Sequence, residues 1–166
     1  MSAIIKGRVW KYGDNINTDI ISPGQYIGQP IELQAEHAME AIDTEFYKKI
    51  RPGDILVAGN NFGSGSSRET APRILKHLGI SAIIANSFAR IFYRNAMNLG
   101  LPVLDMTNTS NIQEGDIIEI NLVAGKIFNH TQGTEYKGTK LPEHLIEMVE
   151  IGGLEPFLAK KLNITL

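Results

Sequence analysis

The chain has 166 residues, of which 43% are hydrophobic and 20% charged, and its formal net charge at pH 7 is −2. These values favour one compact domain spanning residues 1–166. The weak charge and the scattered lysines and arginines argue against nucleic acid as a partner. No stretch approaches the roughly 20 apolar residues of a membrane-spanning helix, and no secretory leader is visible, so we expect a cytoplasmic protein without a membrane partner.

Cysteine is absent from the sequence. This excludes disulfides, thiolate catalysis and any iron–sulfur cluster ligated by this chain alone. The histidines, His37, His77, His130 and His144, do not have the paired spacing of zinc ligands. We therefore predict no metal site and no resident cofactor on this chain.

The N-terminal third has the least regular pattern. Residues 4–10 indicate a strand, and the Pro- and Gly-rich segment SPGQYIGQP at 22–30 indicates a loop. An amphipathic helical pattern runs from 33 to 50, and the Pro and Gly of residues 51–54 end it. The apolar, branched run at 55–58 then predicts a buried strand.

The loop at 60–70, NNFGSGSSRET, lies between this strand and a helix predicted at 67–78. Gly63 and Gly65 permit close backbone approach, and Ser66 or Ser67 can cap the helix, whose first N–H groups favour an anion. Arg68 adds a planar fork suited to a carboxylate or a phosphate.

The letters of this loop do not match a P-loop, a dinucleotide fingerprint or a nucleophile elbow. A serine-capped helix after a flexible turn is the simpler interpretation for any single Gly or Ser of the loop. That interpretation accounts less well for Arg68.

Strands and helices alternate further along the chain. The pattern predicts a strand at 81–85, a helix at 88–99 capped by Ser87, and a strand at 101–104. This alternation indicates an α/β fold with a parallel sheet covered on both faces. Later segments predict a β-meander or hairpin and two helices that pack on the sheet edge, at 116–123, 126–129, 135–137, 141–150 and 154–162.

A second polar cluster, NTDIIS at 17–22, contains Asp19. Taken alone, Asp19 is best interpreted as a turn residue or a cap. If Asp19 lies beside Arg68 and Ser66, the three supply an anion clamp, a hydroxyl and an acid or base in one pocket. Arg90 and Arg94 lie four residues apart, and we favour solvated charges for them over a cleft or partner surface.

Together, NTDIIS and the stretch NNFGSGSSRETAPRILKHLGISAIIANSFARIFYRNAMNLGLPVL resemble the swivelling domain of the aconitase superfamily. More closely, the chain resembles the small subunits of 3-isopropylmalate dehydratase and its relatives, over residues 1 to about 125. The resemblance implies a swivelling β/β/α domain: a mostly parallel central sheet flanked by helices, with an additional C-terminal β-hairpin.

The resemblance also implies a function. A heteromeric hydro-lyase of leucine biosynthesis would interconvert 2-isopropylmalate and 3-isopropylmalate, with a [4Fe–4S] cluster on a large partner subunit and a small dicarboxylate as substrate. We expect a hetero-oligomer, while the isolated chain could form a homo-oligomer. The alternatives are a related subunit, of 2,3-dimethylmalate dehydratase or homoaconitase, and a non-catalytic anion-binding module.

Site roles follow from the same resemblance. Ser66 would be the base that removes the proton next to a substrate carboxylate, and Asp19 would act with a partner histidine around the substrate hydroxyl. Arg68, with Ser67 and Gly65, would bind a substrate carboxylate. The segment containing Tyr26, Ile27 and Gly28 would face the variable end of the substrate, where relatives acting on a third carboxylate carry arginine. Gly28 therefore favours a small or apolar group.

One position departs from the family pattern. Many relatives read SSREHA, whereas this chain has Thr70 in place of the histidine. Any part that the histidine plays in orienting the loop is open here.

Overall fold

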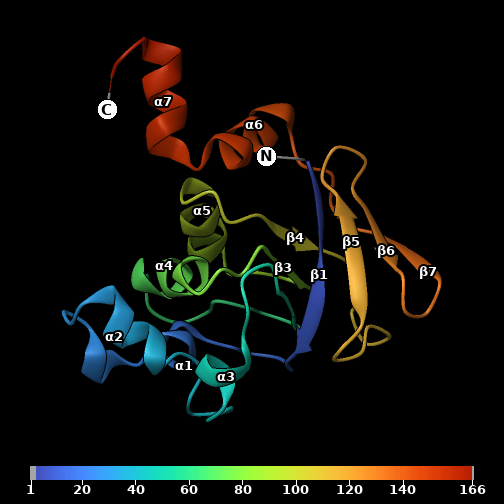
Figure 1. Ribbon diagram of the computed structural model, residues 1–166, viewed down its shortest axis with the longest axis horizontal. Helices are drawn as coiled ribbons and strands as arrows, with labels where there is room; N and C mark the ends of the chain where they lie inside the picture. Colours follow the sequence, from blue (N-terminus) through green and yellow to red (C-terminus); the bar gives the residue numbers. More distant parts are fainter. Residues whose placement is uncertain (1–2, 166) are drawn as a thin grey trace.

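A computed structural model describes residues 3–165 as one seven-stranded sheet with helices beside it (Figure 1). The strand order is β4-β3-β2-β1-β5-β6-β7. In chain order the elements are β1 (Ile4–Lys11), α1 (Thr18–Ile21), a 3-10 turn (Gly24–Tyr26), α2 (Ile31–Glu36), α3 (Phe46–Lys49), β2 (Ile55–Val57), α4 (Thr70–His77), β3 (Ala82–Ala85), α5 (Arg90–Asn98), β4 (Val103–Asp105), β5 (Ile117–Asn121), β6 (Lys126–Asn129), β7 (Thr134–Lys137), α6 (Glu143–Ile151) and α7 (Leu154–Leu162).

The sheet has two halves that meet at β1. Strands β4, β3, β2 and β1 are mutually parallel, with Trp10 opposite Leu56 and Ile83 opposite Val103. On its other edge β1 pairs antiparallel with β5, and β5, β6 and β7 continue as a meander. The predicted parallel core and C-terminal hairpin are therefore both present, in one continuous sheet.

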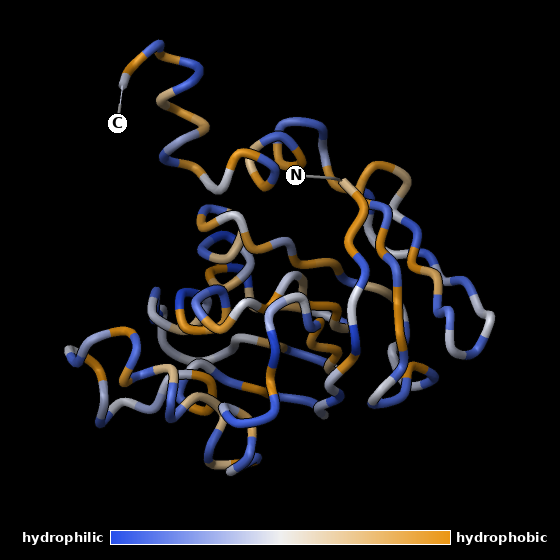
Figure 2. The backbone as a smooth tube through the Cα atoms, in the orientation of Figure 1, coloured by the Kyte–Doolittle hydropathy of each residue, from blue (hydrophilic) through white to orange (hydrophobic). Residues whose placement is uncertain are grey.

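Burial explains which strands occupy the interior. Every residue of β2 and β3 is buried, as expected for parallel strands shielded on both faces. In β5 buried and half-buried residues alternate, which is the pattern of a strand with one covered face. Figure 2 shows hydrophobic residues along several strands of the sheet, β3 and β4 among them.

Two predicted details of the helices are wrong. The segment 33–50 is not one helix: α2 ends at Glu36 and α3 begins at Phe46. Between them Met39 is fully buried with a φ of +60°, and its N–H donates to the carbonyl of Ile20 at 3.1 Å. A left-handed residue ends a helix, so the tertiary bond to α1 overrides the amphipathic pattern.

The predicted serine caps are also wrong. α4 begins only at Thr70, after a cap position, Glu69, that makes no side-chain bond. The hydroxyl of Ser87 accepts the N–H of Asn61 at 2.8 Å instead of capping α5. The hydroxyls of Ser66 and Ser87 bond to Thr18 and Asn61 in neighbouring segments instead of capping a helix.

The C-terminal helices pack on a helix of the parallel half. α6 and α7 contact α5, and residues of α6 also lie near Ile4 and Val123 at one end of the sheet. In Figure 1 they occupy the upper end of the molecule, and α7 projects away from α1 and α2 at the lower end. Within residues 3–165 no helix has both the length and the apolar content needed to cross a membrane.

Candidate functional site

The site lies where the chain leaves the carboxyl ends of β1 and β2. Because these strands are parallel and adjacent, the segments that follow them emerge at the same edge. Backbone bonds join the two segments: the N–H of Gly63 donates to Ile16 at 2.7 Å, and the N–H of Thr18 donates to Ser64 at 2.8 Å. The two polar clusters of the sequence thus form one surface.

Asp19 and Arg68 form an ion pair across this junction. Nη1 of Arg68 donates to Oδ1 of Asp19 at 2.7 Å and to the carbonyl of Ser22 at 2.9 Å. Asn17, not Asp19, caps α1, since its side chain accepts the N–H of Ile20 at 2.8 Å. The Arg68 hydrogen bond lowers the pKa of the Asp19 carboxyl below its ordinary value. Asp19 is therefore an anion at neutral pH, with a side chain that is 70% exposed.

The other side of the Arg68 guanidinium stays available. Arginine has five N–H donors, and the two on Nη1 are used by Asp19 and Ser22. Gly24 faces Nη2: a Cβ built at this glycine would lie 3.3 Å from that nitrogen. The missing side chain keeps Nη2 uncrowded, and among the described residues no group accepts a hydrogen bond from Nη2.

Ser66 is exposed and bonded to a buried hydroxyl. The hydroxyl of Thr18 donates to the carbonyl of Ser66 at 2.9 Å, and the Thr18 and Ser66 hydroxyl oxygens are 3.2 Å apart. A carbonyl only accepts, so when Thr18 donates to it the Ser66 proton points toward Thr18. If Ser66 lost that proton, Thr18 could rotate its own hydrogen onto the Ser66 oxygen.

Thr70 also takes part in holding the loop. Its hydroxyl lies 3.0 Å from the hydroxyl of Ser22, whose carbonyl accepts from Arg68. Thr70 therefore connects the first turn of α4 to the segment that contains Asp19.

The remaining predicted residues of the loop lie around these groups. Ser67 is exposed, and in the described part of the chain its side chain has no hydrogen-bond partner. Gly65 has a φ of +101°, and a Cβ there would come within 3.3 Å of the Thr18 hydroxyl. A side chain at Gly65 would thus disturb both the turn and the contact between Thr18 and Ser66.

An open hollow of about 390 Å³ lies beside Asp19. Residues 23–25, at the start of the loop 23–30, form one wall. Within this loop Tyr26 is half-buried, Ile27 is 45% exposed, and Gly28 is exposed with a φ of +92°. The hollow is lined by Asp19, Pro23, Gly24, Gln25, Glu40 and Ala41.

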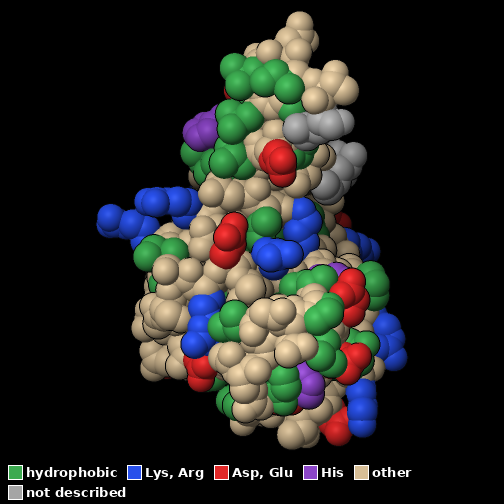
Figure 3. All heavy atoms as spheres, turned by 90° about the vertical axis from the view of Figure 1, so that its left-hand side faces the viewer, with side chains coloured by type: hydrophobic (Ala, Val, Ile, Leu, Met, Phe, Trp, Pro, Cys, Tyr) green, Lys and Arg blue, Asp and Glu red, His purple; other side chains and the backbone are tan. Residues whose placement is uncertain are grey.

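The structure brings Asp19, Ser66 and Arg68 together, with Gly65 and Ser67 on the same loop. Sequence reasoning did not assign roles to Thr18 or Gly24. The hydroxyls flanking Asp19 were a signal for Thr18, whereas nothing in the letters distinguishes Gly24 from an ordinary loop glycine. Arg90 and Arg94 are exposed and, among the described residues, make no ion pair. On the face in Figure 3, Lys and Arg lie in separate groups among Asp and Glu.

Nowhere in residues 3–165 do three or more His, Cys, Asp or Glu side chains form a group that could hold a metal ion. The donors at this edge are instead hydroxyls, backbone N–H groups and a guanidinium, next to one carboxylate. Such a set suits an anionic substrate better than a cation.

Comparison with known proteins agrees with this fold. The model of the aconitase C-terminal domain matches residues 3–109. The isopropylmalate/citramalate isomerase small subunit of Methanocaldococcus jannaschii is 54% identical over 98% of both chains. The 3-isopropylmalate dehydratase small subunit of Nautilia profundicola is 53% identical over 96% of this chain and 97% of its own length.

Solved structures agree as well. The crystal structure of 3-isopropylmalate dehydratase from M. jannaschii superposes with a TM-score of 0.90 at 45% identity, covering 96% of each chain. Aconitase X of Thermococcus kodakaraensis, at 16% identity and a TM-score of 0.51, shares the fold alone. The chain belongs to the aconitase C-terminal domain family, and within it to the small subunits of 3-isopropylmalate dehydratase. This confirms the resemblance and the fold class derived from the sequence.

Proposed function

We propose that this chain is the small subunit of a two-subunit hydro-lyase that interconverts 2-isopropylmalate and 3-isopropylmalate by dehydration and rehydration. The observation that carries the proposal is the meeting of Asp19, Ser66 and Arg68 at one edge of the parallel sheet. The relatives whose names state this activity cover nearly the whole chain.

In this proposal Ser66 removes the proton next to a substrate carboxylate. A serine hydroxyl is a weak acid, so its alkoxide must be stabilised where the reaction occurs. Thr18 is suited to do so because it is buried and its hydroxyl already lies 3.2 Å from the Ser66 oxygen. The positive charge of Arg68, two residues along the loop, acts in the same direction.

Arg68 binds a substrate carboxylate through the donors on its open side. Asp19 and the Ser22 carbonyl hold Nη1, which fixes the plane of the guanidinium before substrate arrives. Orientation in advance reduces the entropy lost on binding. The exposed Asp19 carboxylate is also available to a group of the partner around the substrate hydroxyl.

The chain cannot complete this reaction alone. Loss of the hydroxyl needs an electrophile, and the cysteine-free sequence contains no thiolate to ligate a cluster. A [4Fe–4S] cluster on the large subunit would supply a Lewis acid for the hydroxyl. The exposed edge with Ser66 and Asp19 would then face that subunit.

The loop 23–30, whose first three residues line the hollow beside Asp19, fits the proposed substrate. Further along, this loop offers the exposed apolar side chain of Ile27 and the bare Gly28, with no cation among residues 23–30 to bind a third carboxylate. An alkyl substituent of the substrate can pack there, whereas a further carboxylate would lose solvation without gaining a partner.

Reconstitution tests the proposal. This chain is mixed with a cluster-loaded large subunit, and conversion of 2-isopropylmalate is followed alongside citramalate, 2,3-dimethylmalate and homocitrate. We expect turnover only with both subunits, strongest with alkylmalates and weakest with homocitrate. Turnover by either subunit alone, or a preference for homocitrate, would contradict the proposal. Binding of malate-type anions without any turnover in the mixture would favour the anion-binding module.

A further inference from the structure

The loop 23–30, which starts at the hollow, has few backbone hydrogen bonds of its own. Within residues 23–30, local backbone bonds join Tyr26 to Pro23 at 3.1 Å, Ile27 to Gly24 at 3.2 Å and Gln29 to Tyr26 at 3.1 Å. A three-residue 3-10 turn held by such bonds is not stable by itself in water. The position of this loop must therefore be set by contacts with the rest of the fold.

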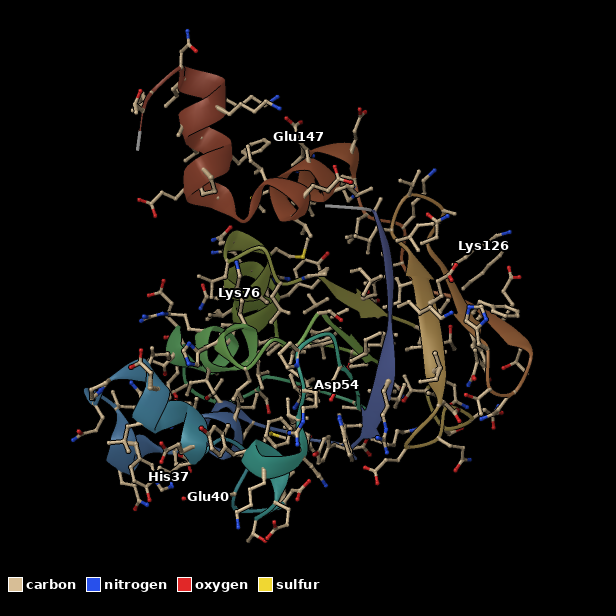
Figure 4. All side chains as sticks on the ribbon, in the orientation of Figure 1. His37, Glu40, Asp54, Lys76, Lys126 and Glu147 are labelled. Atoms are coloured by element: carbon tan, nitrogen blue, oxygen red, sulfur yellow. The ribbon has the colours of Figure 1, made fainter. Side chains whose placement is uncertain are left out.

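One such contact is an aromatic stack. The rings of Tyr26 and His37 lie 3.7 Å apart and within 7° of parallel. His37 follows α2, and its Nδ1 lies 2.8 Å from Oε2 of Glu40. A carboxylate only accepts hydrogen bonds, so Nδ1 carries the proton and the bond fixes the imidazole plane. Figure 4 shows His37 and Glu40 next to each other beside α2.

A second contact holds the far end of the loop. The side-chain N–H of Gln34 donates to the carbonyl of Gln29 at 2.8 Å, and Gln34 is only 6% exposed. Its Oε1 is the one buried side-chain nitrogen or oxygen atom in the described residues that lacks a hydrogen-bond partner. A buried amide with an unpaired oxygen is costly, and its one hydrogen bond is to the loop.

The negative charge of Glu40 lies at the edge of the hollow. Its side chain lines the hollow together with Asp19, so an unpaired Glu40 carboxylate would face a dianionic substrate. The bond to His37 holds that charge against the ring. His37 therefore contacts the loop through its face and Glu40 through its edge.

We propose that His37, Glu40 and Gln34 are positioning residues that hold the loop 23–30 in the conformation that receives the variable group of the substrate. They do not touch the reacting atoms. They act through Tyr26 and Gln29, and they leave Ile27 as the apolar side chain that the substrate meets. The inference rests on the proposed function for its substrate, while the anchoring itself concerns this chain alone.

Hydrogen exchange on the isolated full-length chain tests the anchoring. We expect His37→Ala to speed exchange of the Ile27 and Gln29 amides by roughly tenfold, because opening of the loop becomes easier. His37→Phe keeps a stacking ring and should show a smaller increase. The matched controls are His144→Ala and Glu36→Gln, on exposed residues without partners in the described chain, and both should leave exchange unchanged.

Kinetics of the two-subunit complex tests the consequence. If only a fraction of molecules holds the loop in place, apparent affinity falls by that fraction, so His37→Ala should raise KM about tenfold with kcat changed by less than about twofold. Glu40→Gln and Gln34→Leu should raise KM less. His37→Ala combined with Glu40→Gln should cost less than the product of the two effects, since the residues form one unit.

These outcomes distinguish the anchoring of the loop from its role in substrate binding and from the proposed function. Unchanged exchange in His37→Ala overturns the anchoring. Faster exchange with an unchanged KM overturns its role in substrate binding. If the wild-type complex does not turn over alkylmalates, the proposed function fails, while the exchange result still decides whether the loop is anchored.

Discussion

The two halves of the sheet differ in function because their strands are connected differently. Strands β1 to β4 are parallel, so each connection crosses back over the sheet and the following loops collect at one edge. Strands β5 to β7 are antiparallel and joined by short turns at 122–125 and 130–133. All of the proposed site residues come from the connections between strands of the parallel half. The antiparallel half extends the sheet from β1.

Two aspartates illustrate this contrast. The Asp19 side chain is 70% exposed and pairs with one arginine. Asp116, just before β5, is 5% exposed and accepts hydrogen bonds from Gln113, Asn129 and Gln132 at 2.7 to 2.8 Å. A buried carboxylate with one oxygen that accepts three hydrogen bonds stabilises a turn, whereas one with open space around it is available for chemistry. Substitutions in the two halves should therefore affect different properties.

The largest expected effect is that of Ser66→Ala. Losing the proposed base should reduce turnover of the complex by about 10²- to 10⁴-fold, because a positioned base contributes that much to rate. Ser66 is exposed, so the melting temperature should not change. Ser64→Ala on the same loop is the control and should retain most activity, because the Ser64 side chain has no assigned role and no hydrogen-bond partner among the described residues. Equal losses of turnover in both variants would show that Ser66 is not the base.

Arg68→Lys comes next. Lysine keeps the charge but cannot hold Asp19 and Ser22 with one nitrogen while presenting two further donors to a carboxylate. We expect kcat/KM to fall by about two orders of magnitude, mainly through KM, as measured by steady-state kinetics of the complex. Full activity with lysine would mean that the planar fork is not used.

Asp116→Asn should affect stability and spare activity. Losing a carboxylate that accepts three hydrogen bonds should cost about 2 kcal/mol at pH 7, measured by urea unfolding. Its hydrogen bonds from Gln113, Asn129 and Gln132 outweigh the opposing effect of burial and lower the pKa of Asp116. The stabilisation is therefore present above the unfolded-state pKa and is lost as pH falls through the folded-state pKa.

The same pH dependence supplies the check. Wild type and Asp116→Asn should converge in stability as the solution is acidified below about pH 4. Glu135→Gln in the same half, at an exposed pair 3.4 Å from Lys126, should change stability by less than about 0.5 kcal/mol. A constant gap between wild type and Asp116→Asn at all pH values would show that the charge is not the cause.

Thr18→Val should slow turnover by about tenfold, since it removes the hydroxyl that can donate to a deprotonated Ser66 while keeping the shape. Thr18→Ser restores the hydroxyl and should restore most of the rate. If Thr18→Ser is as slow as Thr18→Val, restoring the hydroxyl does not restore the rate, which would contradict the proposed role of the Thr18 hydroxyl.

The smallest expected effect is that of Gly24→Ala. A Cβ 3.3 Å from Nη2 of Arg68 must displace the guanidinium by a few tenths of an ångström, so KM should rise by a few fold. Gly13→Ala is the matched control, because a Cβ there meets nothing within 4 Å. A KM that rises equally in both variants would show that the absence of a side chain at Gly24 does not matter for substrate binding.

Sequence reasoning succeeded where local pattern decides structure. The alternation of apolar strands and helices predicted the parallel core, and the bounds of β6 and α7 match their predicted ranges. It failed where a tertiary contact overrides pattern, as at Met39, which a bond to Ile20 holds in the left-handed region. The serine caps failed for a similar reason, since Ser87 binds Asn61 of a neighbouring loop.

For the site, the residue types could be predicted and their partners could not. Glycines, serines and an arginine after a buried strand indicate an anion site at any sequence position. The pairing of Arg68 with Asp19, 49 residues away, depends on β1 and β2 being neighbours in the sheet. No local sequence pattern predicts that these two strands are neighbours. The space at Gly24 depends in turn on where Arg68 points.

The most direct test is a titration of this chain into a fixed amount of cluster-loaded large subunit, with turnover of 2-isopropylmalate as the readout. Wild type should raise activity from near zero to a plateau. Ser66→Ala should compete with wild type for the large subunit and lower that plateau, because it binds equally well but supplies no base. A large subunit that is fully active before this chain is added, or restored equally by Ser66→Ala, would contradict a site shared between the two chains.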